Sequence, residues 1–291
     1  MIGISECINY LFFKIKIVLL SELKTQNSMK KLITALFLTI SCTLFAQSIV
    51  NITYVTVPRE NSETFLELHE KFTNLSLGEE RKLQQSAMFS HAFAGDFTFA
   101  IYDFYETEVA LVSDVAIGNT IMAANIKAMN LDEKGKAAMN ADYQSYISMY
   151  VEGHSDQIRT SKGLEALKFE NETIDWSTKK VVVLSKYNTK WAKNKDFREA
   201  MVDGNLTGLK ESGKVEAVYT SRHLYGAGMD WHMYMFYNSW SVFAEYEESN
   251  FGGSMDATSM KLWSAINGHE DEILMWIGAI NPETKRFYYA K

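Results

Sequence analysis

Histidine and aspartate recur at a fixed spacing in two places in this sequence. The hexads GHSDQI (153–158) and GHEDEI (268–273) both read Gly-His-x-Asp-x-Ile and lie 115 residues apart. An imidazole and a carboxylate two residues apart can orient each other and act as an acid/base pair on one ligand. The same residues also suit a structural role, because glycine caps helix ends, histidine favours the negative end of the helix dipole and isoleucine can begin a strand. Duplication would preserve either feature, so both interpretations stay open.

A second set of polar side chains falls in RHLYGAGMDWHMYMFY, residues 222–237. If this segment forms a hairpin that turns at its central Ala-Gly pair, residues whose numbers sum to 455 face each other. His223 then lies opposite His232, and Tyr225 lies opposite Asp230. All four side chains would share one face of the sheet.

Two imidazoles and a carboxylate on one wall would suit a divalent metal, because neutral histidine and aspartate are standard ligands of zinc, iron and copper. His223, His232 and Asp230 are therefore candidate metal ligands. A haem is the other cofactor that the histidines admit, with His223, His232 or His269 as the axial ligand. The simpler alternative is that these histidines belong to the core or form the polar wall of a pocket.

This hairpin is one copy of an internal repeat. The segment SHAFAGDFTFAIYDFY (90–105) matches residues 222–237 without a gap at an offset of 132. The matched pairs include His91 with His223 and Tyr102 with Tyr234. The copies also differ, because the first has Ala100 where the second has His232.

Similar elements precede and follow each hairpin. Strand-like sequence at 51–57 and 180–186 comes first, and amphipathic helical sequence follows at 62–77 and 192–211. After the hairpin, helical sequence at 107–152 and 240–267 leads into the hexad, and a strand ends each half, at 273–280 in the second and at 164–169 in the first. The predicted order in each half is β-α-β-β-α-β.

That order, taken twice, resembles the dimeric α/β-barrel superfamily. The resemblance implies an α+β fold of two ferredoxin-like β-α-β-β-α-β repeats, with their sheets packed face to face as an α/β barrel. It also implies helices outside the barrel and a pocket between the sheets. The superfamily includes haem-degrading monooxygenases, chlorite dismutase-like haem proteins, monooxygenases without cofactors and members without assigned activity, so the fold does not fix a function.

We expect a ligand between the sheets, on a face lined more by the second half than by the first. Period-two alternation places polar and aromatic side chains of both hairpins on this face: His223, His232, Asp230, Tyr219, Tyr234, His91 and Tyr102. Methionine and tryptophan are abundant in the same segments, so a small apolar or aromatic molecule is the expected partner.

The amino terminus has the layout of an export signal. The stretch MKKLITALFLTISCTLFAQ, from Met29, combines two lysines, an apolar run and Ala46 before Gln47. We interpret residues 1–46 as an over-called start followed by a signal peptide, with lipidation at Cys42 as an alternative. The mature protein would be periplasmic or extracellular, with repeats at 47–170 and 171–291.

Composition narrows the function classes. Without its first 46 residues the chain has 24 basic and 34 acidic residues, no cysteine and no further stretch that predicts a membrane span. A net charge of −10 disfavours nucleic acid as a partner. The sequence leaves the oligomeric state open. Three functions remain: an exported small-molecule-binding protein, a cofactor-free, metal- or haem-dependent monooxygenase-like enzyme, and a structural or interaction protein.

Overall fold

The computed structural model describes residues 49–291 apart from residues 94 and 251–254. The predicted signal peptide therefore lies outside the described residues. The first half contains β1 (Ile49–Val55), η1 (Arg59–Asn61), α3 (Ser62–Ser76), β2 (Leu83–His91), β3 (Phe99–Tyr105), α4 (Glu108–Ala128), α5 (Glu133–Val151) and β4 (His154–Thr160). A connection with η2 (Glu165–Leu167) and β5 (Phe169–Glu170) leads to the second half.

The second half repeats this order with shorter helices. It contains β6 (Lys180–Thr189), α6 (Asn194–Ala200), a π-helical segment η3 (Met201–Leu206), α7 (Thr207–Glu211), β7 (Val215–Tyr225), β8 (Trp231–Tyr237), α8 (Trp240–Asn250), α9 (Ala257–Ala265), β9 (Ile266–Ile280) and β10 (Phe287–Tyr289). The small β10 pairs only at the edge of β9, outside the repeat.

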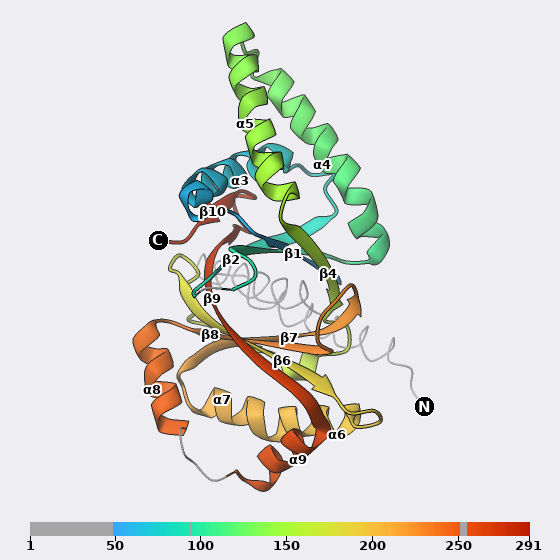
Figure 1. The fold of residues 1–291 in the computed structure, drawn as a ribbon, viewed down its shortest axis with the longest axis vertical. Helices are drawn as coiled ribbons and strands as arrows, with labels where there is room; N and C mark the ends of the chain where they lie inside the picture. The colour runs from blue at the N-terminus through green and yellow to red at the C-terminus, as the bar shows by residue number, and fades with distance from the viewer. Residues whose placement is uncertain (1–48, 94, 251–254) are drawn as a thin grey trace, which may run out of the picture. The chain divides into compact units, whose positions relative to one another are not determined.

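Eight of the described strands close into an antiparallel barrel. The first half has the order β2-β3-β1-β4, and the second has the equivalent order β7-β8-β6-β9. Strand β4 pairs with β7, and β9 pairs with β2, so each half supplies the partner for the other's edge strands. Helices α3 to α5 lie outside the first half, and α6 to α9 lie outside the second (Figure 1). The predicted α+β barrel of two ferredoxin-like repeats is confirmed.

The register of the hairpins confirms the offset of 132. Ala87 faces Tyr102 in the first hairpin, and Tyr219 faces Tyr234 in the second. Each residue of the second pair lies 132 positions beyond its counterpart in the first. The repeat in the amino-acid sequence therefore corresponds to a repeat in strand pairing.

Three predicted elements differ from the structure. The last strand of the first half is β4, which begins at the hexad, whereas residues 164–169 form mainly the turn η2. The predicted helix at 107–152 is two helices: Asn130 at a φ of 47° ends the first region, and Asp132 caps α5 by accepting a hydrogen bond from Gly135 N. Likewise, 240–267 contains α8, α9 and the start of β9.

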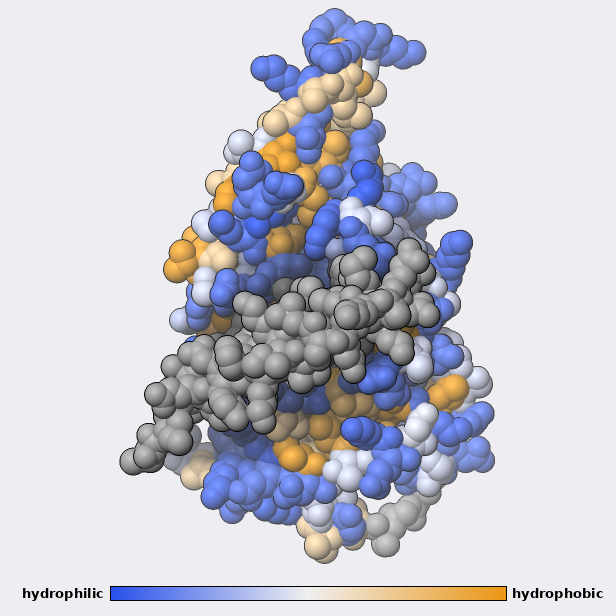
Figure 2. Space-filling view, turned by 180° about the vertical axis from the view of Figure 1, so that it is seen from behind, coloured by the Kyte–Doolittle hydropathy of each residue, from blue (hydrophilic) through white to orange (hydrophobic). Residues whose placement is uncertain are grey.

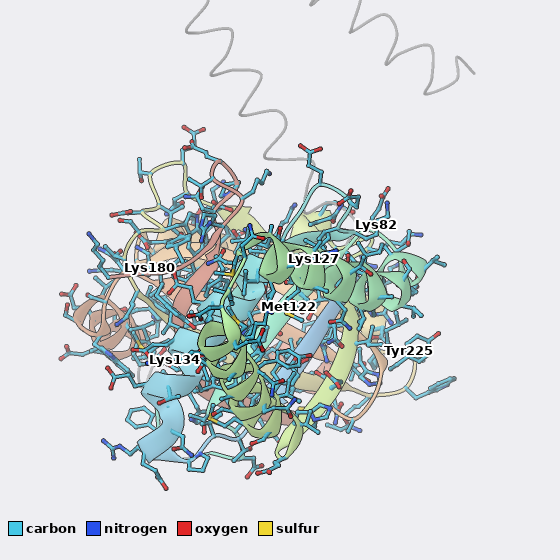
Figure 3. All side chains as sticks on the ribbon, turned by 90° about the horizontal axis from the view of Figure 1, so that it is seen from above. Lys82, Met122, Lys127, Lys134, Lys180 and Tyr225 are labelled. Carbon is cyan, nitrogen blue, oxygen red and sulfur yellow. The ribbon has the colours of Figure 1, made fainter. Side chains whose placement is uncertain are left out.

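Hydrophobic side chains pack in layers inside and outside the barrel. The interior is rich in rings from both halves, including Phe89, Tyr102, Tyr234, Phe236 and Trp276. In α3, buried residues recur at helical spacing and turn one face toward the sheet: Phe65, Leu68, His69 and Phe72. Met122 of α4 packs with this helical layer (Figure 3).

Helix α4 is long and apolar, yet most of it is exposed. It is the one described helix whose length and composition would allow it to cross a membrane, and only 11% of its most apolar window is buried. Val109, Val112 and Val115 are 77%, 79% and 65% exposed. Apolar side chains accordingly reach the surface where α4 and α5 project from the barrel (Figure 2).

Candidate functional site

The β7–β8 hairpin has a different register from the predicted one. Ser221 faces His232, and Tyr219 faces Tyr234, so the numbers of facing residues sum to 453. His223 is therefore not opposite His232. A shift of two residues keeps the alternation of faces, so His223 and His232 still lie on the same face of the sheet.

The turn explains the error. It is centred near Gly226, which has a φ of 92° in the region that glycine adopts without strain. Backbone His223 N donates to Asp230 O, so the predicted pairing of Tyr225 with Asp230 is also wrong. Tyr225 instead pairs with Ile158 of β4, and its 61% exposed side chain points away from the molecule (Figure 3).

Three predicted site residues do meet inside the barrel. His232 is 1% exposed, and its Nδ1 lies 3.0 Å from the Tyr234 hydroxyl oxygen. The Tyr102 ring packs edge-on against Tyr234, with ring centroids 5.6 Å apart. Burial, reinforced by the charges of Arg159 and Lys186, holds the pKa of His232 well below its usual range, so the imidazole stays neutral.

The other predicted residues have separate partners. His223 Nε2 lies 2.7 Å from Gly226 O, and His91 Nδ1 lies 2.5 Å from Phe93 O. The Asp230 carboxylate accepts hydrogen bonds from the backbone and hydroxyl of Thr189. Tyr219 donates to Glu170.

No metal site emerges from this arrangement. Across the described residues, no three His, Cys, Asp or Glu side chains gather closely enough to bind a metal ion. His223, His232 and Asp230 share one face of the sheet, but each side chain interacts with a different neighbouring group. His269, a third candidate for a haem axial ligand, stacks on Tyr187 on the outside of β9.

Arg159 is the interior residue that the sequence did not single out. It is fully buried, and its N–H groups donate to Ser221 Oγ, Ser221 O, Gln157 Oε1, Met229 O and Asp230 O. All five acceptors are uncharged, so the guanidinium fastens β4 to β7 and to the turn before β8. Arg159 was missed because the last strand of the first half was predicted at 164–169, whereas this residue lies in β4.

A cavity lies outside the barrel, between the sheet of the first half and its helices. Its volume is about 180 Å³. Strands β2 and β3, helices α3 and α5, and the segment before β2 line it: His69, Thr73, Ser76, Arg81, Leu83, Ser86, Ile101, Asp103, Tyr146, Ile147 and Tyr150. Polar and ionisable groups thus surround a space that could hold a small molecule.

His69 lines this cavity and has one ring nitrogen without a hydrogen-bond partner. Its Nδ1 lies 3.0 Å from the Tyr146 hydroxyl oxygen, whereas its buried Nε2 has no hydrogen-bond partner. Burial lowers the pKa of His69 to about 4, so the ring is neutral at pH 7. Burial raises the pKa of Tyr146 well above its usual range, so its hydroxyl stays protonated and can donate to Nδ1. Nε2 then carries the ring proton.

Asp103 is the ionisable group best suited to proton transfer here. Burial raises the pKa of Asp103 to about 6, against the opposing effects of a hydrogen bond from Ser86 and the charge of Arg81. A carboxyl with this pKa exchanges protons readily near neutrality. The sequence offered one signal, since Asp103 is the only charged residue in the otherwise apolar strand FAIYDFY.

A largely buried ion pair borders the cavity. Arg81 donates to the Asp114 carboxylate from Nε at 2.9 Å and from Nη2 at 2.7 Å. Asp114 is 1% exposed and also accepts from the backbone of Lys82. This network ties α4 to the segment before β2 and fixes Arg81 beside the cavity.

The repeated hexads occupy equivalent places on the outer face of the sheet. Thr53 donates to Asp156 Oδ1 at 2.6 Å in the first half, and Ser185 donates to Asp271 Oδ1 at 2.5 Å in the second. The histidines complete each group, with Nε2–carboxylate distances of 3.6 Å for His154–Asp156 and 3.2 Å for His269–Asp271. Each imidazole therefore meets the aspartate of its own hexad.

The expected helix-capping role of the hexad glycines is wrong. Gly153 follows the end of α5, and Gly268 lies within β9. Neither is among the described glycines with positive φ. A side chain at residue 153 would meet the Thr56 carbonyl oxygen at 3.0 Å, so close packing accounts for the first glycine.

Comparison with known proteins supports the fold. No protein-family model and no curated protein matches the chain. An anthrone oxidase-like protein of known structure aligns with 81% of this chain and 94% of its own, with a TM-score of 0.56 and 11% identity. A monooxygenase-like protein from Fusobacterium nucleatum aligns with 84% and 95%, with a TM-score of 0.50 and 10% identity. The chain thus has the dimeric α/β-barrel fold, and identities this low are evidence for the fold alone.

Proposed function

We propose that this protein is an enzyme that binds a small ring-shaped molecule in the cavity of the first half and transfers a proton to or from it. The observation that carries the proposal is the lining of the cavity, where Asp103, His69, Tyr146 and Tyr150 border one space. Clustering of such groups in one pocket is typical of active sites.

The cavity suits a ligand with one aromatic ring. A volume of about 180 Å³ is slightly larger than the roughly 150 Å³ cavity that holds benzene in other proteins. Leu83, Ile101 and Ile147 provide apolar walls for the ring. The polar side chains would bind a hydroxyl or carbonyl group attached to it.

The proposed chemistry assigns roles to Asp103 and His69. Above pH 6 the ionised Asp103 accepts a proton from a phenol or enolisable ketone, leaving a protonated carboxyl and the ligand's anion. His69 Nε2–H donates to the oxygen on which negative charge develops, because a neutral imidazole can stabilise an oxyanion without giving up its proton. Such deprotonation is the first step that an oxidase or monooxygenase of phenolic rings needs, and the fold of the oxidase-like and monooxygenase-like neighbours supports this class.

Binding of 4-nitrophenol tests this proposal, because the phenol and its anion absorb at different wavelengths. We expect wild type to bind the probe and to stabilise the anion above pH 6. Asp103→Asn should weaken binding roughly tenfold to hundredfold by removing a charge-assisted hydrogen bond, and Thr73→Phe should prevent binding by filling the cavity. Val112→Ser, on the exposed side of α4, is the matched control. Equal binding by all four proteins would contradict the proposal.

The barrel interior is a second candidate site. His232 Nε2 and Glu272 Oε2 are buried there without hydrogen-bond partners. Because aromatic rings fill most of the interior, a ligand of this site would be a small polar molecule rather than the apolar one expected from the sequence. Retained probe binding in Thr73→Phe together with loss in His232→Phe would favour this site over the outer cavity.

We also propose that the protein is exported, on the strength of the signal-like sequence from Met29 to Ala46. Mass spectrometry of protein from the exported fraction should find Gln47 as the first residue. An intact chain that begins upstream of Gln47 in that fraction would contradict export with cleavage at Ala46.

A further inference from the structure

Helix α4 has one face packed against the protein and one face exposed to solvent. Asp114 and Gly118 are buried on the inner face, and Met122 packs with the helical layer of α3 and α5. On the opposite side, exposed residues recur at alternating intervals of three and four: Val109, Val112, Ala116, Asn119 and Ala123. They form one stripe along the helix because 3.6 residues complete a turn. We call these five residues the outer face of α4.

The outer face has the residue spacing at which helices pair. Apolar residues at alternating intervals of three and four form the contact seam between two paired helices. Val109 and Val112 are 77% and 79% exposed. Between Glu108 and Lys127 the one charged residue is Asp114, which is buried. An uncharged stripe about 30 Å long is thus exposed, as is typical of protein interaction sites.

The charges at the two ends of α4 indicate what binds this stripe. Glu108 and Lys127 are both exposed, and neither side chain pairs with another described residue. If a second copy of α4 runs antiparallel, residues whose numbers sum to 235 face each other, so Glu108 of each copy meets Lys127 of the other. A parallel pair would instead place like charges together. Opposite charges that meet at both ends favour the antiparallel register.

We propose that the outer face of α4 binds the outer face of a second copy of this chain, forming an antiparallel dimer. The twofold axis passes between residues 117 and 118, and Val112 packs against Ala123 of the second copy. One end of α4 lies beside the barrel and the other at the tip where α4 joins α5 (Figure 1). An antiparallel pair therefore places the two barrels at opposite ends, where they do not collide. This inference is independent of the proposed function.

The size of the contact predicts a weak dimer. Two helices in contact along the outer face bury on the order of 1,000 Å² in total, the lower limit of specific interfaces. We expect a dissociation constant on the order of tens of micromolar. Well below this concentration α4 is exposed as in the monomer, so substitutions on its outer face leave the monomer's stability almost unchanged.

A membrane surface is the other partner that an exposed apolar helix could have. Helices that lie on membranes carry lysine and arginine on their polar face. The polar face of α4 is instead packed against the protein, and between Glu108 and Lys127 the helix has no basic residue. Its composition therefore favours a second copy over a lipid surface.

Sedimentation equilibrium of the full chain tests the dimer. Val112→Glu should weaken association about tenfold or more by placing a charge in the seam, with an unchanged circular dichroism spectrum. Val151→Glu, at a 54% exposed valine of α5, is the matched control and should behave like wild type. Association by any other part of the chain would be common to all of these proteins.

Charge reversal tests the register. Glu108→Lys and Lys127→Glu should each weaken the dimer roughly threefold to tenfold, because each creates two like-charge contacts. The double variant, Glu108→Lys with Lys127→Glu, should restore wild-type association. Two weak single variants and an equally weak double variant would overturn the antiparallel register.

Disulfide trapping tests the orientation in a chain whose Cys7 and Cys42 are replaced by serine. Asn119→Cys should form a disulfide between copies, because residue 119 lies near the twofold axis. Val109→Cys should not, because an antiparallel pair separates the two copies of residue 109 by about 25 Å. The reverse pattern would contradict the antiparallel arrangement.

Two further results would overturn the dimer. One is a wild type that stays monomeric at about ten times the expected dissociation constant. The other is a monomeric wild type that floats with vesicles of phosphatidylethanolamine and phosphatidylglycerol when Val112→Glu does not. That result would assign the outer face of α4 to a lipid surface.

Discussion

Asp103 and His69 show how burial at one cavity moves two pKa values in opposite directions. The neutral form of each group is favoured, so the pKa of the acid rises to about 6 and that of the imidazole falls to about 4. Ionisation of an acid whose pKa is raised by burial lowers the stability of the folded state. Such a cost is typical of residues retained for function rather than for stability.

Asp103→Asn should therefore stabilise the protein at pH 7.5. The folded-state pKa lies above the unfolded value, so the wild-type carboxyl contributes its full stability below about pH 4 and loses it as the pH rises toward 6. Asparagine removes this loss and should raise the free energy of unfolding by roughly 1–3 kcal/mol at pH 7.5. Urea unfolding at pH 7.5 and pH 4 measures the effect; a gain of the same size at both pH values would contradict it.

His69 should contribute to acid unfolding with the opposite sign. Its folded-state pKa lies below the unfolded value, so its stability is complete above about pH 6.5 and is lost as the pH falls toward 4. The loss amounts to at most roughly 3 kcal/mol. His69→Phe, which keeps a ring beside Phe65, should have a shallower fall of unfolding free energy between pH 6.5 and 4. An unchanged slope in urea titrations would show that His69 is already solvated.

At the scale of elements, α4 combines apolar packing on α3 with a buried polar contact. Asp114 is 1% exposed and pairs with Arg81, whereas Val112 and Val115 point largely into solvent. A buried charge that loses its partner is left without compensation. This ion pair therefore contributes to the attachment of α4 beside the cavity.

Asp114→Asn should cost roughly 3–5 kcal/mol of unfolding free energy, because Arg81 is left as a largely buried charge without its partner. Val112→Ser, on the same helix, should change it by less than about 0.5 kcal/mol. Chemical denaturation followed by circular dichroism compares the two variants. Similar losses in both would mean that the exposed face of α4 is packed in solution.

The sequence predicted some parts of the fold and of the candidate site and missed others. Most strands and the hairpin repeat were predictable because period-two alternation and the gapless match at an offset of 132 indicate strand pairing directly. The barrel was predicted from the resemblance of the repeated element order to the dimeric α/β-barrel superfamily. The exact hairpin register was not, since the conformation of Gly226 sets it. The cavity was missed because His69 looks like a core residue on the apolar face of α3, and only tertiary packing brings it near Asp103.

At the scale of the whole molecule, neither half completes its own sheet. Strands β2 and β4 are the edges of the first-half sheet, and their outer sides pair with β9 and β7 of the second half. The ring-rich interior is likewise assembled from both halves. Separated halves would expose unpaired strand edges and a large apolar face.

Residues 47–170 expressed alone should therefore self-associate or stay unfolded, and mixing them with residues 171–291 should restore a soluble heterodimer with native circular dichroism. Size-exclusion chromatography distinguishes these states. A folded, stable monomer of either half would show that the barrel is not one cooperative unit.

The most direct test of the account is a carbon-13 NMR titration of the Asp103 carboxyl, with and without saturating 4-nitrophenol. We predict a pKa of about 6 in the free protein and a clear shift of this pKa when the probe binds. A carboxyl that titrates like an exposed aspartate and does not respond to the probe would contradict the assignment of this cavity as the active site.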